Sequence, residues 1–277
     1  NFLAIMRAGH TDYVINAAAL TYMAKRGLSK EVIALLAEGT AHFPNAASWQ
    51  AHLAALGLDR LKVHPDPVRT ATEGALYGAI AHHGLLDDAV VLSDGAGQFR
   101  VAKHALCWVH AERLVNGLST FSAAQRKLVE KIRRRVWWLY ADLKAYAATP
   151  SSQRKSQLKA RFKDLFSQRT GFAPLDRLLR RLLARQEALL MVLERPEVPL
   201  HTNGSENDIR SQVTRRTISG GTRSDRGRDC RDGFLGLFKT CDKLGISTWQ
   251  YLGDRLGIPD SAKVPALADL IRARAPG

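Results

Sequence analysis

A long block of amphipathic sequence, residues 111–193, constrains the fold of this chain more than any other feature. Its apolar residues recur every three to four positions, which is the period of one face of an α-helix. Three stripes follow this period, and each is long enough for a helix. They comprise Leu128, Ile132, Val136, Leu139, Leu143 and Tyr146, then Leu158, Phe162, Leu165 and Phe166, then Leu175, Leu178, Leu179, Leu182 and Leu183. The block therefore predicts helices that pack against one another.

The same block holds most of the positive charge of the chain. Residues 122–185 contain 17 Lys and Arg against four acids, which leaves +13, and the whole chain has a net charge of +15. An ordinary solvated surface mixes both signs, and that alternative stays open for some of these helices. An excess of this size favours contact with a polyanion such as nucleic acid.

Composition excludes several other classes of protein. The 277 residues are 45% apolar, which is enough for a sizeable core and argues against disorder. The sequence has no uninterrupted run of 18 apolar residues and no visible N-terminal signal, so we expect no membrane partner. Three cysteines form an odd, sparse set, which is typical of a reducing cytoplasm.

The sequence before this block predicts helices and then two short strands. Residues 1–60 read as mostly helical, and a Pro-rich break at residues 64–67 separates them from a helix at Thr70–Ala81. The aliphatic run Ala89–Leu92 is typical of a buried strand, and a second strand is predicted at His104–Trp108. We therefore predict an α/β, predominantly helical fold.

Asp94 directly follows the first predicted strand. A carboxylate at the carboxyl end of a buried strand lies where α/β sheets place ligands and metal ions. The alternative is that Ser93-Asp94-Gly95 is an ordinary turn, because Asp-Gly is common turn chemistry. Position alone does not separate the two interpretations.

Glu206 lies in the first turn of a helix predicted after the turn Asn203-Gly204-Ser205. A carboxylate on rigid backbone suits a metal ligand. The alternative is purely structural, since Asn203 and Glu206 have the spacing of a capping box, and Glu206 and Arg210 the spacing of an i, i+4 ion pair.

Cys107 and His110 have the spacing of half a zinc site, but Cys230 and Cys241 do not supply an obvious second half. A buried, structural pair is the favoured interpretation. The Gly-rich and Arg-rich segment at residues 219–228 could present backbone N–H groups to phosphate, although it matches no nucleotide-binding fingerprint. Motifs of serine hydrolases and zinc metalloproteases are absent from the sequence.

Three segments together resemble the DDE transposases of bacterial insertion sequences, and most closely the insertion-sequence-sixty-six type. They are Val91-Leu92-Ser93-Asp94-Gly95-Ala96-Gly97-Gln98-Phe99, His104-Ala105-Leu106-Cys107-Trp108-Val109-His110-Ala111-Glu112-Arg113 and Leu200-His201-Thr202-Asn203-Gly204-Ser205-Glu206-Asn207-Asp208-Ile209-Arg210. Their order, with a helical insert between the second and third, is more specific than any one segment.

The resemblance implies a ribonuclease-H-like core in which two aspartates and a glutamate bind two divalent ions, normally Mg²⁺, with Mn²⁺ as the alternative. Asp94 matches the second aspartate and Glu206 the glutamate. Cys107 and His110 match a C-x-x-H signature that supports the site, and we expect Asn203 and Arg210 to support it as well. We expect the first aspartate to lie upstream of Asn1, so that this fragment alone would be inactive.

These expectations give a partial ribonuclease-H-like core at residues 1–110, a basic helical insertion at 111–198, and a core-completing Glu helix with C-terminal helices at 199–277. The implied function is metal-dependent cleavage and strand transfer at the ends of an insertion sequence. The partners would be double-stranded DNA and further copies of the chain, in the bacterial cytoplasm at the nucleoid. We expect phosphate contacts from Arg133, Arg134, Arg135, Arg180, Arg181, Arg215, Arg216 and Arg223. The rival hypothesis is a non-catalytic, DNA-binding remnant of a transposase.

Overall fold

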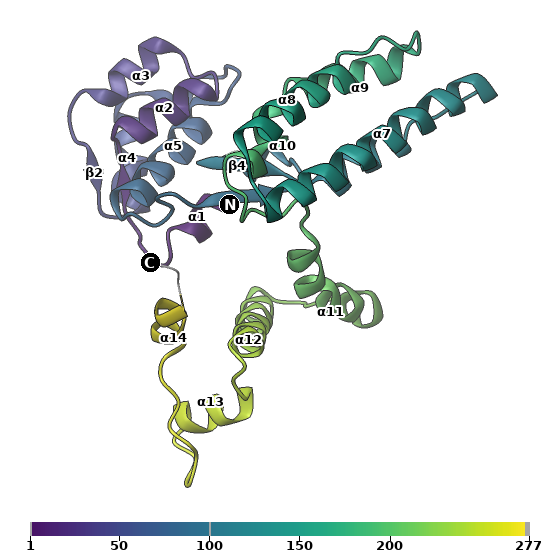
Figure 1. The fold of residues 1–277 in the computed structure, drawn as a ribbon. Helices are drawn as coiled ribbons and strands as arrows, with labels where there is room; N and C mark the ends of the chain where they lie inside the picture. The colour runs from purple at the N-terminus through teal and green to yellow at the C-terminus, as the bar shows by residue number, and fades with distance from the viewer. Residues whose placement is uncertain (1, 100, 275–277) are drawn as a thin grey trace. The chain divides into compact units, whose positions relative to one another are not determined.

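A computed structural model describes residues 2–99 and 101–274 of the chain. The chain divides between Thr202 and Asn203 into two compact units, which are described separately below. Both units are mostly helical, so the predicted predominance of helix is confirmed (Figure 1). No helix within the described residues is both long and apolar enough to cross a membrane.

The first part of unit 1 is a layer of short helices with two very short strands. In chain order the elements are α1 (Phe2–Met6), β1 (Tyr13–Val14), α2 (Ala17–Lys25), α3 (Lys30–Ala37), β2 (His42–Phe43), α4 (Ala46–Ala55), η1 (Leu58–Arg60) and α5 (Pro67–His82). Strands β1 and β2 pair antiparallel. The sequence did not predict these strands, because two residues are too few to show the alternation of a strand.

Helix α5 is the centre of this layer and starts earlier than the predicted Thr70. The Asp66 side chain accepts a hydrogen bond from Arg69 N–H, which caps the helix and lets Pro67 occupy its first position. Gly78 faces β1 so closely that a Cβ there would lie 2.0 Å from the carbonyl oxygen of Val14. Only glycine therefore allows this approach of α5 to β1.

Strands β3 (Val90–Ser93) and β4 (Lys103–Leu106) pair in parallel, with Ser93 opposite Leu106. Both predicted strands are present, although the second ends two residues before the predicted Trp108. Trp108 is instead the first residue of a helix, because its indole is buried in the helical core that follows. In Figure 1, helices α2 to α5 and the long helices within residues 123–183 of the same unit extend to opposite sides of this strand pair.

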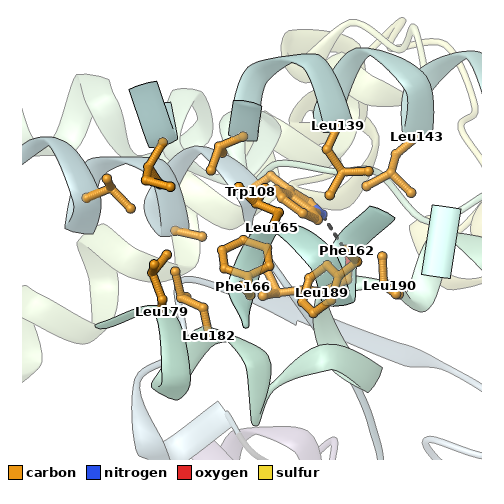
Figure 2. Packing of buried hydrophobic residues seen from close by; sticks show 14 of the residues in the cluster. Trp108, Leu139, Leu143, Phe162, Leu165, Phe166, Leu179, Leu182, Leu189 and Leu190 are labelled. Atoms are coloured by element: carbon orange, nitrogen blue, oxygen red, sulfur yellow. Dashed lines mark hydrogen bonds between the residues drawn. The ribbon is translucent and has the colours of Figure 1, made fainter. Parts of the chain in front are cut away.

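The predicted helical block is confirmed. It contains α6 (Trp108–Asn116), α7 (Ala123–Ala148), α8 (Ser152–Phe166), α9 (Ala173–Leu183), α10 (Gln186–Leu189) and η3 (Met191–Leu193). All three predicted stripes face one apolar core. Two of their residues, Leu128 and Leu183, are only partly buried, and Val129, which was not on a predicted stripe, is buried instead of Leu128. Trp108 lies within this core, where its Nε1–H donates to the Leu189 carbonyl at 2.8 Å (Figure 2).

Unit 2 consists of α11 (Asn203–Ser219), α12 (Asp225–Lys243), α13 (Thr248–Arg255) and α14 (Leu267–Arg274). Of its described residues, Cys241 and Leu244 are buried apolar side chains. Large apolar side chains on its surface include Ile209, Val213, Ile218, Phe234, Phe238, Trp249, Leu256 and Ile258. The predicted turn at Asn203–Ser205 is wrong, because α11 starts at Asn203 itself and these residues form its first turn.

Candidate active site and nucleic-acid interface

Asp94 follows the last residue of β3 and lies at the surface. Its Oδ1 accepts a hydrogen bond from the Ala96 backbone N–H at 3.0 Å, and Gly95 adopts a left-handed φ of +99°. Asp94 therefore does shape a turn, as the structural interpretation expected. The turn also holds the exposed carboxylate at the carboxyl end of a parallel strand pair, where its remaining lone pairs could bind a cation.

Other side chains of unit 1 gather at the same strand end. The Ser93 hydroxyl lies 2.8 Å from His104 Nε2 and accepts from the Gly95 backbone N–H at 3.0 Å. A Cβ on Gly95 would lie 2.9 Å from Nη1 of Arg185. The Arg185 guanidinium therefore lies beside Gly95, the residue after Asp94. Arg185, His104 and Glu187 help to line a pocket of about 230 Å³. The sequence did not single out Arg185, which belongs to no recognisable motif, and it assigned no role to His104, although His104 begins the second of the three quoted segments.

Cys107 directly follows the last residue of β4, and His110 lies three residues later. The Cys107 backbone N–H donates to the Ser93 carbonyl at 2.9 Å, which continues the pairing of β3 and β4 up to the residue before Asp94. The Cys107 side chain is buried at the start of α6. His110 lies in the first turn of α6, and its Nε2 is 3.5 Å from Arg113 Nη1. The hydrogen bond from Cys107 therefore connects the start of α6 to β3, the strand that Asp94 follows.

Glu206 belongs to unit 2 and is half-buried in the first turn of α11. Asn203 and Arg210 lie on the same helix, and both are exposed. The capping-box interpretation requires Asn203 to precede the helix, and it is wrong because the helix includes Asn203. Glu206 is thus in the position of a first-turn acid, which the helix dipole favours.

In the basic helices of unit 1, acidic side chains form ion pairs with nearby arginines. Arg133 donates to Glu112 at 2.6 Å and to Glu130 at 3.0 Å, and the hydrogen bond to buried Glu112 raises the pKa of Arg133. Arg135 pairs with Asp164. These two arginines hold helices together, whereas Arg134, Arg180 and Arg181 are exposed on α7 and α9.

Unit 2 carries a second group of exposed cations. Arg215 and Arg216 lie near the end of α11, and Arg223 lies in the Gly-containing loop before α12. This loop is shorter than the predicted segment at 219–228, because α12 already starts at Asp225. The Ser224 side chain caps α12 by accepting from the Gly227 N–H.

A cluster that sequence reasoning missed surrounds Asp12, the residue before β1. The buried Asp12 carboxylate lies 3.0 Å from His42 Nε2 and 2.9 Å from His83 Nε2. Burial raises the pKa of Asp12, but the hydrogen bonds from His83 and His42 outweigh burial and lower it below the usual value. His83 is 71 residues from Asp12, so no local spacing in one sequence could reveal this cluster.

Comparison with known proteins decides the family. A sequence model described as the Transposase IS66 family matches residues 79–229, a stretch that includes Asp94, Cys107, His110 and Glu206. The chain belongs to the IS66 transposase family. This confirms the resemblance carried by the three segments. Family membership implies a DDE-type transposase, DNA as a partner and a general use of divalent metal ions.

The comparisons also include a curated relative. An uncharacterized protein, y4jO of Sinorhizobium fredii (strain NBRC 101917 / NGR234), is 47% identical over 276 residues, which cover 99% of this chain and 85% of that protein. No solved structure matches this IS66 family chain. The similarity to y4jO extends over both units, beyond the part that the family model matches.

Proposed function

We propose that this IS66 family chain carries the part of a transposase that cleaves DNA at the ends of an insertion sequence and joins the cut strand to a target. The observation that carries the proposal is the position of Asp94, an exposed carboxylate at the carboxyl end of a parallel strand pair and inside the family match. Glu206, inside the same match, is the proposed second carboxylate.

The donor chemistry of these residues fits the proposed ions. Carboxylate oxygens are hard ligands, which Mg²⁺ prefers and Mn²⁺ accepts. Asp94 and Glu206 would hold the ions, and Cys107 would support the site by fixing the end of β3. His110, Asn203 and Arg210 are proposed to orient the site or the DNA. When bound, two such ions supply charge neutralisation at the scissile phosphate and activation of the attacking oxygen.

The proposed reaction needs no covalent bond between enzyme and DNA. Cleavage leaves a 3′-hydroxyl, which attacks a phosphate of the target strand in line and displaces the 3′-oxygen of the adjacent nucleotide. The role of the protein is then to hold the reacting groups in position and to stabilise the charge that develops.

The fold elements around Asp94 have a proposed place in this function. We infer that residues 1–110, with β3 and β4, belong to a ribonuclease-H-like core, and that residues 111–198, which include α7 to η3, form a helical insertion in it. The exposed Arg134, Arg180 and Arg181 would bind the phosphates of a DNA end, with Arg215, Arg216 and Arg223 as a second group. Two or more copies would then act together on paired ends, in the cytoplasm at the bacterial DNA.

The cleavage proposal is tested with the full encoded chain, a duplex that carries the element end, and Mg²⁺ or Mn²⁺. Asp94→Asn and Glu206→Gln keep the side-chain shape and remove one negative charge each. We expect each to reduce strand cleavage at least about 10³-fold, because lost ion binding removes charge stabilisation worth several kcal/mol. Asp59→Asn, on an exposed side chain of η1, is the matched control. Near-normal cleavage by either site variant would remove that residue from the site.

The DNA-binding proposal is tested by the salt dependence of duplex binding. Each phosphate contact contributes a slope of about −0.9 to the plot of log affinity against log salt concentration. The double variant Arg180→Ala/Arg181→Ala should therefore flatten the slope by up to about 2, while Lys30→Ala on α3 should leave it unchanged. An unchanged slope in the double variant would show that Arg180 and Arg181 do not contact phosphate.

A further inference from the structure

Histidines are concentrated at one place in the first part of unit 1. His10 lies between α1 and β1, His42 on β2, and His82 and His83 at the end of α5. These are four of the nine histidines of the chain. His10, His42 and His83 lie around the buried carboxylate of Asp12, and the ring of His82 lies beside those of His42 and His83. None of these residues belongs to the proposed DNA-cleavage site.

The distances within this cluster suit a bound ion. One nitrogen each of His10 and His83 and one oxygen of Asp12 all lie within 4.8 Å of one another. Ligand bonds of about 2.0–2.1 Å in a tetrahedral zinc site place the ligand atoms roughly 3.3 Å apart. The separation of 2.9 Å between Asp12 Oδ2 and His83 Nε2 is already close to that value. His10 is exposed and lies outside any helix or strand, so a small side-chain movement would complete the set.

Hydrogen bonding alone accounts for only part of the cluster. The imidazoles of His42 and His83 suffice to satisfy the Asp12 carboxylate. The ring of His10 stacks on His83 with centroids 3.7 Å apart and an interplanar angle of 17°. The stacking holds the His10 ring next to the Asp12–His83 pair, with ligand atoms of all three residues within 4.8 Å of one another. Because a nitrogen lone pair lies in the plane of its ring, the exposed His10 side chain would turn out of the stack to face an ion shared with His83.

We propose that His10, Asp12 and His83 bind a divalent transition-metal ion, with Zn²⁺ as the best fit. Two imidazole nitrogens and one carboxylate oxygen are a borderline donor set, which suits Zn²⁺ and not Mg²⁺. The three protein ligands leave a fourth position open to solvent. His42, hydrogen-bonded to Asp12, is the outer partner that orients the liganding carboxylate.

The ion would join two segments that are distant in the sequence. Asp12 precedes β1 and His83 follows α5, so a bond from each to one ion links the edge of the small sheet to the end of the central helix. Because a bound metal ion stabilises the folded state by mass action, we expect Zn²⁺ to raise the thermal midpoint of unfolding.

The test is titration of the metal-free 277-residue chain with Zn²⁺ alone, followed by calorimetry and by thermal unfolding. We expect one saturable site per chain and a raised midpoint. His10→Ala should lower the affinity at least about tenfold and abolish the thermal shift, and His42→Ala should lower the affinity about 10- to 100-fold. His64→Ala, an exposed histidine outside the cluster, is the matched control.

His10 is the critical variant, because its side chain is exposed and its removal should not prevent folding. Visible absorption of the Co²⁺-substituted chain gives a second measurement, and a tetrahedral spectrum is expected that His10→Ala eliminates. The proposal is overturned if Zn²⁺ shows no one-to-one saturable binding, or if His10→Ala binds Zn²⁺ as tightly as the unaltered chain. An equal response to Mg²⁺ in titration would also overturn it.

Discussion

The proposed helical insertion of unit 1 and the helices of unit 2 both expose cations, but they differ in how much apolar surface they bury. Helix α7 alone has six buried side chains, and α6 to η3 share one continuous core. In unit 2, α11 has no buried side chain among its described residues, and α12 has one, Cys241. Phe234 and Phe238 on α12 are exposed, although their rings lie 5.9 Å apart.

The exposed cations of the two regions therefore lie on helices of different rigidity. The cations of the insertion are attached to a packed core, so their spacing is fixed before DNA arrives, which lowers the entropy lost on binding. Helix α11, which carries Glu206, gains little stability from apolar burial within unit 2. Most helical stability in proteins comes from packing of an apolar face, so α11 and α12 should be the less stable helices.

The largest expected effect is on unfolding. Phe162→Ala removes a fully buried ring from the insertion and should lower the free energy of unfolding by about 3–5 kcal/mol. Phe238→Ala, the same change on an exposed ring of α12, should cost less than about 1 kcal/mol. Urea denaturation followed by circular dichroism measures both. A comparable loss in Phe238→Ala would mean that the apolar face of unit 2 is covered, and the contrast would fail.

An intermediate effect is expected from the ion pairs that brace the insertion. Glu112→Gln removes the charge that faces Arg133 in a buried position and should cost about 1–3 kcal/mol, because the guanidinium keeps only a neutral partner there. Glu130→Gln changes the exposed partner of the same arginine and should cost less than about 0.5 kcal/mol. Equal costs for the two variants would show that burial of Glu112 does not matter.

The smallest expected effect concerns the loop between α8 and α9. Asp176 accepts hydrogen bonds from the Thr170 backbone N–H at 2.8 Å and hydroxyl at 2.7 Å, and these bonds lower the pKa of its carboxyl. Asp176→Ala should cost about 1 kcal/mol at neutral pH. A lowered folded-state pKa gives stability that is present above the ordinary pKa of Asp and is lost as the pH falls through the lowered value.

The stabilities of the unaltered chain and Asp176→Ala should therefore begin to converge as the pH falls below about 4, and thermal midpoints from pH 7 down to pH 3 measure this. Asp164→Ala, whose partner Arg135 lies at the surface of the same insertion, is the control with a smaller effect. A difference between the chain and Asp176→Ala that stays constant over this range would contradict the assigned hydrogen bonds.

The sequence predicted the helical block at residues 111–193 well because each of its three long stripes marks one apolar face of a helix. Phe162 and Leu179, for example, lie on predicted stripes and are buried as expected. The prediction failed where the local sequence has no clear signal. Strands β1 and β2 have too few residues for a pattern, and no local signal marks the start of α11 at Asn203.

The candidate site shows the same division. The parallel strand and its turn made Asp94 recognisable, and the family match includes both proposed carboxylates. The approach of Arg185 to Gly95 and of His83 to Asp12 depends on packing between segments more than 70 residues apart, which one sequence cannot reveal.

The central claim is that Asp94 and Glu206 hold the same divalent ions. Iron(II) can replace Mg²⁺ at such sites, and with ascorbate and peroxide it cuts the polypeptide next to its ligands. In the presence of element-end DNA, we predict cuts beside residues 94 and 206, both suppressed by excess Mg²⁺ and both lost in Asp94→Ala. A cut at residue 206 that persists in Asp94→Ala, or cuts at only one of the two positions, would contradict the claim.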